Sequence, residues 1–102
     1  MKRSKYTLRF LRAAEDDFQE IITYIALDSP SAAEALAAKI EKSLSNLSIH
    51  PWLGKIPNEE ELADVGYRFL VVQNYLIFYT VEGRLVWVHR ILHGARDYLS
   101  LL

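Results

Sequence analysis

The spacing of hydrophobic residues changes near residue 11, and this change limits what the chain can fold into. Residues 5–11 alternate, with Tyr6, Leu8 and Phe10 on one side, and a period of two predicts a half-buried strand. The apolar residues that follow recur at helical spacing, and they are Leu11, Ala14, Phe18, Ile21, Ile22 and Ile25. The pattern therefore predicts a strand that leads directly into an amphipathic helix.

A second helix is expected immediately after the first. The first helix should end by Asp28-Ser29-Pro30, because the residue before a proline avoids the helical region. Pro30 suits the first turn of the next helix, and Ser31-Ala-Ala-Glu34 has the form of a capping box. An apolar stripe then runs as far as His50-Pro51 through Ala33, Leu36, Ala37, Ile40, Leu44 and Leu47. Two helices joined so tightly are expected to pack as an antiparallel hairpin.

The second half of the chain has the pattern of a β-meander. Residues 51–66 form one long connector, and three runs rich in β-forming residues follow, Tyr67–Val72, Tyr75–Val81 and Arg84–Leu92. Tyr98–Leu102 is a short apolar tail with room for one helical turn. The sequence thus predicts a single α+β domain, residues 1–102, of order β–α–α–β–β–β, in which the helical hairpin covers one face of an antiparallel sheet.

Composition excludes several classes of protein. The chain of 102 residues has no cysteine, which rules out disulfides, thiol catalysis and thiolate metal sites. We find no metal-ligand spacing, no glycine-rich phosphate loop and no serine nucleophile with its partners, so no metal or cofactor is expected. No apolar run is long enough for a signal peptide or a membrane span, which predicts a cytoplasmic protein. The net charge of −1 argues against a protein that binds nucleic acid through many phosphate contacts.

Polar residues in and after the meander are the candidates for a functional site. Arg68 lies in an apolar strand and can either bind phosphate or carboxylate or form a structural ion pair. His93 can transfer a proton near neutral pH or fix the turn before Gly94. Tyr75 and Tyr79 share a strand face and are expected in the core, with their hydroxyls hydrogen-bonded. Trp52 is expected to anchor the connector.

Several motifs together resemble those of the ParE-like toxins of the RelE/ParE superfamily. Tyr75-Leu-Ile-Phe-Tyr79 and Val86-Trp-Val-His-Arg-Ile-Leu-His-Gly-Ala-Arg-Asp97 resemble the C-terminal signature of these toxins. Pro51-Trp-Leu-Gly54-Lys55 resembles their connector, with lysine in place of the usual arginine, and Tyr67-Arg68-Phe-Leu resembles their arginine-bearing strand. The likeness covers nearly the whole chain, although the helices are generic.

The resemblance implies a toxin that is neutralised by a cognate antitoxin and that contacts DNA only through this partner. It implies two possible activities, inhibition of DNA gyrase by binding or cleavage of messenger RNA on the ribosome. We favour gyrase because the connector is acidic apart from Lys55 and would repel RNA. The chain would then be an inhibitor rather than an enzyme, and no catalytic residue is assigned; a nuclease would use Arg68, Arg90 and His93.

The expected contact residues fall into two groups. Residues expected to contact the target are Arg68, Arg90, His93, Arg96, Tyr98, Leu101 and Leu102. Residues expected to contact the antitoxin are Phe18, Ile22, Ile25, Leu36 and Ile40.

Overall fold

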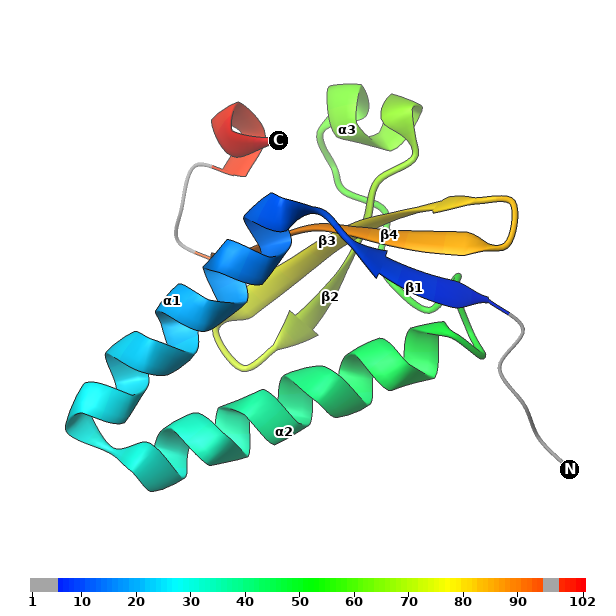
Figure 1. Ribbon diagram of the computed structural model, residues 1–102. Helices are drawn as coiled ribbons and strands as arrows, with labels where there is room; N and C mark the ends of the chain where they lie inside the picture. Colours follow the sequence, from blue (N-terminus) through cyan, green and yellow to red (C-terminus); the bar gives the residue numbers. More distant parts are fainter. Residues whose placement is uncertain (1–5, 95–97) are drawn as a thin grey trace, which may run out of the picture.

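The computed structural model describes residues 6–94 and 98–102, and its elements follow the predicted order (Figure 1). A strand β1 (Thr7–Phe10) leads into helices α1 (Arg12–Asp28) and α2 (Pro30–Leu47). A short helix α3 (Glu60–Val65) precedes the meander, which consists of β2 (Arg68–Val72), β3 (Tyr75–Glu82) and β4 (Leu85–His93). The chain ends in a 3-10 turn, η1 (Tyr98–Leu101), as the apolar tail predicted.

Ser29 alone separates the two long helices. It ends α1 in an extended conformation, and its side-chain oxygen accepts a hydrogen bond from the amide of Ala32 at 3.3 Å. The predicted capping box at Ser31 is therefore wrong, since the cap of α2 lies two residues earlier. Pro30 occupies the first turn as expected, because its missing N–H would have no helical partner there. Figure 1 shows α1 and α2 diverging from this junction.

The sheet has the strand order β1-β4-β3-β2. The three C-terminal strands form the predicted antiparallel meander. β1 pairs with β4 in parallel, from Thr7↔Leu85 to Phe10↔Val88, so the sheet is mixed. The sequence did not reveal this placement, because a short strand carries no local signal for its partner. The long connection that a parallel pair requires runs from β1 through the helices and then through β2 and β3 to β4.

The main core lies between the helices and one face of the sheet. The helices contribute Ala14, Leu36, Ile40, Leu44 and Leu47, and the strands contribute Val72, Ile77, Tyr79, Val86, Val88 and Ile91. A separate cluster of aromatic side chains lies on the other face, where Phe78 is fully buried beneath Tyr67, Phe69 and Tyr98. The sequence predicted that only one face of the sheet would be covered, by the helical hairpin. Figure 1 shows α2 on one side of the strands and α3 with η1 on the other.

The connector contains the helix that the sequence reading missed. Glu60 and Glu61 stand in the first turn of α3, and Gly66 ends it with a left-handed φ of 101°. Acidic residues at the start and glycine at the end are both helix signals, but six residues were too few to show a period. Upstream of α3, Lys55 pairs with Phe69, so the connector lies along the outer edge of β2. None of the helices in the described part of the chain is long and apolar enough to cross a membrane.

Candidate functional site

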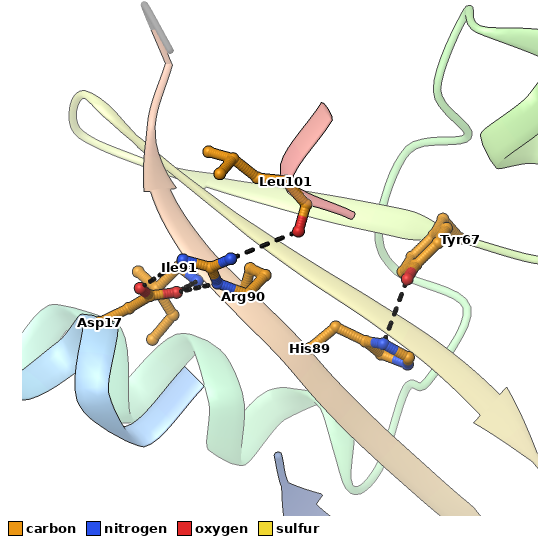
Figure 2. A network of polar contacts seen from close by, with 6 residues as sticks. All are labelled: Asp17, Tyr67, His89, Arg90, Ile91 and Leu101. Atoms are coloured by element: carbon orange, nitrogen blue, oxygen red, sulfur yellow. Dashed lines mark hydrogen bonds and ion pairs between the residues drawn. The ribbon is translucent and has the colours of Figure 1, made fainter. Parts of the chain in front are cut away.

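Arg90 on β4 is held by Asp17 on α1 (Figure 2). The guanidinium donates through Nε to Asp17 Oδ2 at 2.7 Å and through Nη2 to Oδ1 at 2.9 Å. Two parallel bonds of this kind are stronger than neutral hydrogen bonds and fix orientation. The hydrogen bonds that Arg90 donates to Asp17 also raise the pKa of Arg90, so this side chain stays charged.

The Asp17 carboxylate also binds the backbone of β4 at the edge of its pairing with β1. The pairing between β1 and β4 ends where the amide of Leu11 donates to the carbonyl of Val88 at 3.0 Å. Beyond that point the amide of Ile91 donates to Asp17 Oδ2 at 3.0 Å. A buried N–H without an acceptor would be costly, and the carboxylate supplies this acceptor in place of a strand. Asp17 thus joins α1 to β4 through both a side chain and the backbone.

Arg90 also holds the end of the chain. Its Nη1 donates to the carbonyl of Leu101 at 3.3 Å (Figure 2). The expectation that Arg90 faces a target is therefore revised, because its guanidinium is engaged inside the chain. The residue acts as a link between α1, β4 and η1.

The C-terminal turn is attached to the aromatic face of the sheet. The Tyr98 hydroxyl donates to Glu59 Oε2 at 2.8 Å, and its ring lies 4.9 Å from that of Phe78, centroid to centroid. The bond to Glu59 raises the pKa of Tyr98, with burial as a smaller cause. Leu99 is 41 % exposed, and Leu101 and Leu102 are half-buried. The tail therefore leaves apolar surface accessible while it is docked.

Arg68 on β2 is bound to the connector. Its Nη1 donates to the carbonyl of Gly54 at 2.9 Å and to that of Trp52 at 3.3 Å. The guanidinium lies 5.2 Å from the centre of the Trp52 ring, a cation–π contact. The prediction that Trp52 anchors the connector from beneath is wrong, because the residue is 58 % exposed. Arg68 and Trp52 instead form a stacked pair at the surface.

Tyr79 explains the spacing of Pro51 and Gly54 in the connector. Its buried hydroxyl donates to the carbonyl of Pro51 at 2.8 Å and accepts from the amide of Gly54 at 2.7 Å. Burial raises the pKa of this phenol, so it remains a donor at neutral pH. The prediction of a core tyrosine with a hydrogen-bonded hydroxyl is confirmed for Tyr79, whereas Tyr75 is only partly buried. The partners of the Tyr79 hydroxyl were not predicted, since they are 28 and 25 residues away.

Two histidines on β4 differ in their surroundings. His93 is exposed at the end of the strand, and its ring meets Tyr75 edge-on at 5.5 Å. His89 is half-buried, with Nδ1 3.2 Å from the Tyr67 hydroxyl and Nε2 3.0 Å from Thr80 Oγ1. Burial lowers the pKa of His89, while Glu82 opposes this effect. The lowered pKa favours a neutral, structural imidazole at position 89.

Acidification is expected to destabilise the fold partly through His89. The pKa of this residue is lowered in the folded chain. Below about pH 6.5 the unfolded chain therefore binds more protons than the folded chain, and the free energy of unfolding decreases as the pH is lowered. Melting temperatures at about pH 7 and about pH 5 should therefore differ less for His89→Gln than for the wild type. His50→Gln, at an exposed position after α2, is the matched control. An equal loss in all three proteins would contradict the prediction.

The structure does not gather the expected nuclease residues at one point. Arg68 pairs with Tyr79, which faces the helices, whereas Arg90 pairs with Phe78, which faces the aromatic cluster. His93 lies at the end of β4 opposite Tyr75. Arg96 lies outside the described residues. Within residues 6–94 and 98–102, no group of histidine and acidic side chains is placed to hold a metal ion.

The residues expected to contact an antitoxin fall into two sets. Phe18, Ile22 and Ile25 are partly buried and pack against the core from α1. Leu36 and Ile40 are buried in the core itself, so the expectation that they offer a contact surface is revised. Helical periodicity finds the apolar face of a helix, but it does not show which part of that face the protein's own sheet covers.

Comparison with solved structures defines the fold class. The chain is similar to the chromosomal ParDE toxin–antitoxin system from P. aeruginosa, with a TM-score of 0.70 and 22% identity over 87% of this chain and 96% of that one. It is also similar to the RelBE toxin–antitoxin complex from Mycobacterium tuberculosis, with a TM-score of 0.61 and 24% identity over 87% and 98% of the two chains. A comparison with curated proteins gave no match.

The family follows from the sequence match. Residues 8–98 match the model of the ParE toxin of the type II toxin–antitoxin system parDE. This range contains all but the first residue of β1, both long helices, the connector and the whole meander. The chain belongs to this family of toxins.

Proposed function

We propose that this toxin inhibits DNA gyrase by binding to it and that a cognate antitoxin neutralises it in the cytoplasm. Family membership and the two similar toxin–antitoxin structures support an antitoxin partner. Contact with DNA would come through that partner, in keeping with the net charge of −1. Inhibition by binding needs a surface and no bond-breaking chemistry.

The observation that carries the proposal is that side chains suited to RNA cleavage are engaged within the chain. A ribonuclease needs a group that takes a proton from the 2′-oxygen and cations that stabilise the phosphate as charge develops. Arg90 is held by Asp17, Arg68 by two carbonyls, and Tyr98 by Glu59. Arg90 and Tyr98 would have to release these carboxylates before they could act on a phosphate.

The charge of the connector supports the same reading. Glu59, Glu60, Glu61 and Asp64 lie in and next to α3. The bond from Tyr98 to Glu59 brings this acidic segment beside the C-terminal turn. A negative surface there would repel the phosphates of RNA. A protein target with basic or apolar groups fits this surface better.

We place the contact with the target on the docked C-terminal turn. Leu101 and Leu102 are partly exposed there, as is the ring of Tyr98. His93, at the exposed end of β4, and the stacked pair of Arg68 and Trp52 extend the proposed surface. Apolar and aromatic side chains of this kind are typical of the centres of protein interfaces.

A supercoiling assay with purified gyrase tests the proposal. We expect molar excess of the toxin to abolish supercoiling, and the Leu101→Asp/Leu102→Asp double variant to inhibit at least about tenfold less because it places charge at an apolar contact. Leu27→Asp, at the exposed end of α1, is the control and should inhibit like the wild type. Full supercoiling at large excess would overturn the proposal. Cleaved messenger in a ribosome-programmed extract, with gyrase unaffected, would establish the nuclease alternative.

A further inference from the structure

A groove lies between the two long helices, at the ends that are remote from their junction at Ser29. The described residues that line it are Phe10, Ala14, Glu15, Phe18, Glu41, Leu44 and Ile91. Its walls are the first half of α1 and the second half of α2, and Phe10 of β1 and Ile91 of β4 contribute from the sheet. We call this hollow the α1–α2 groove. Its volume of about 240 Å³ is below the range of roughly 300–1,000 Å³ usual for small-molecule sites.

The lining residues indicate the chemistry of an occupant. Five of the seven are apolar, and the two others, Glu15 and Glu41, are acidic. Pockets for polar metabolites contain converging hydrogen-bond donors and acceptors, whereas these side chains offer an apolar surface between two carboxylates. The groove therefore suits an apolar side chain of a protein partner.

The two carboxylates lie on opposite helices and are free to pair with a binding partner. Asp16 and Asp17, the next two acids on α1, are paired with Arg12 and Arg90 respectively. Within residues 6–94 and 98–102, Glu15 and Glu41 form no ion pair, and both are exposed. Charges at the edge of an interface select partners of opposite sign and accelerate their association.

We infer that the α1–α2 groove selects an antitoxin segment in which an apolar anchor is flanked by lysine or arginine. The anchor fills the hollow between Phe18 and Leu44, and the cationic side chains pair with Glu15 on one helix and Glu41 on the other. This inference rests on the proposed toxin–antitoxin function and adds the two specificity-determining residues. It assigns Glu15 and Glu41 a role in the choice of partner rather than in folding, since neither residue makes an ion pair within the described chain.

A charge-reversal experiment tests the inference with the purified product of the reading frame next to the toxin gene as the probe. Its dissociation constant is measured by calorimetry for the wild type and for the Glu15→Lys/Glu41→Lys variant. We expect the reversal to weaken binding at least about tenfold, because like charges at an interface repel. The Glu34→Lys/Glu82→Lys variant makes the same net change at exposed positions away from the groove and should bind within about threefold of the wild type. Melting temperatures of both variants, measured beside the wild type, test whether they are folded.

Three results would decide against the inference, and they are distinguishable. If the probe does not bind the wild type, the proposed toxin–antitoxin pairing itself fails. If it binds all three proteins equally, the pairing stands and the role of the groove fails. If the wild type is a dimer in light scattering and the groove variant is a monomer, the occupant is a second copy of this chain. Recovery of binding by the groove variant, when acidic residues replace the cations of the probe, would confirm the pairing of charges.

Discussion

Replacing Asp17 by alanine is expected to lower the free energy of unfolding by about 2–4 kcal/mol. The change removes three hydrogen bonds, two from Arg90 and one from the amide of Ile91. The side chains of Arg90 and Asp17 are 22% and 12% exposed, so water only partly replaces the lost contacts. An uncompensated guanidinium next to an unpaired amide explains why the loss should be large. Urea denaturation followed by circular dichroism measures it.

The chain contains its own control for this experiment. Asp16 pairs with Arg12 at 3.4 Å, but these side chains are 58% and 86% exposed, and such pairs contribute roughly 0–1 kcal/mol. Asp16→Ala should therefore change stability little. Asp17→Ala/Arg90→Met should be more stable than Asp17→Ala, because the second change removes the unpaired charge. Equal losses in Asp16→Ala and Asp17→Ala would contradict our account of this contact.

Replacing Gly54 by alanine is the second change expected to be severe, with a loss of about 3 kcal/mol. A Cβ at this position would stand 2.6 Å from Tyr79 Oη, 2.7 Å from its Cε1 and 2.9 Å from the carbonyl oxygen of Phe69. The tyrosine is fully buried and the carbonyl belongs to a strand, so neither can move away cheaply. The connector must shift, and the hydrogen bonds of the Tyr79 hydroxyl would be lost with it. Thermal and urea unfolding would measure the effect.

Gly94→Ala is the matched control for Gly54→Ala. The nearest atoms to a Cβ at Gly94 are the Asn74 carbonyl oxygen at 3.4 Å and Leu76 Cγ at 3.9 Å, which are ordinary contacts. We expect a change below about 1 kcal/mol there. Tyr79→Phe, which removes the hydroxyl without adding bulk, should cost about 1–3 kcal/mol and so separates lost hydrogen bonds from steric overlap. A Gly54→Ala variant as stable as Gly94→Ala would show that the connector has room.

The candidate site was only partly predictable. Arg68, Arg90 and Tyr98 were identified as candidate contact residues in and after the meander, but their roles were assigned from residue type and from the resemblance to ParE-like toxins. An arginine binds an internal carboxylate and a partner's phosphate through the same N–H groups. The presence of arginine in the sequence therefore does not show which of the two it binds. The exposed carboxylates of the groove were missed because Glu15 and Glu41 are 26 residues apart in the sequence and looked like ordinary solvated charges.

Local patterns determined most elements of this protein, with the short helix α3 as the exception. Spacing of apolar residues placed the two long helices, and Pro30 with Ser29 divided them, because both signals act within one or two turns of chain. Only the tertiary structure decided which elements meet. The parallel pairing of β1 with β4, the contact of Asp17 with Arg90 and the bonds of Tyr79 to Pro51 and Gly54 all join distant residues. Such contacts depend on the packing of the whole chain, since the spacing of residues along one element contains no information on its partner.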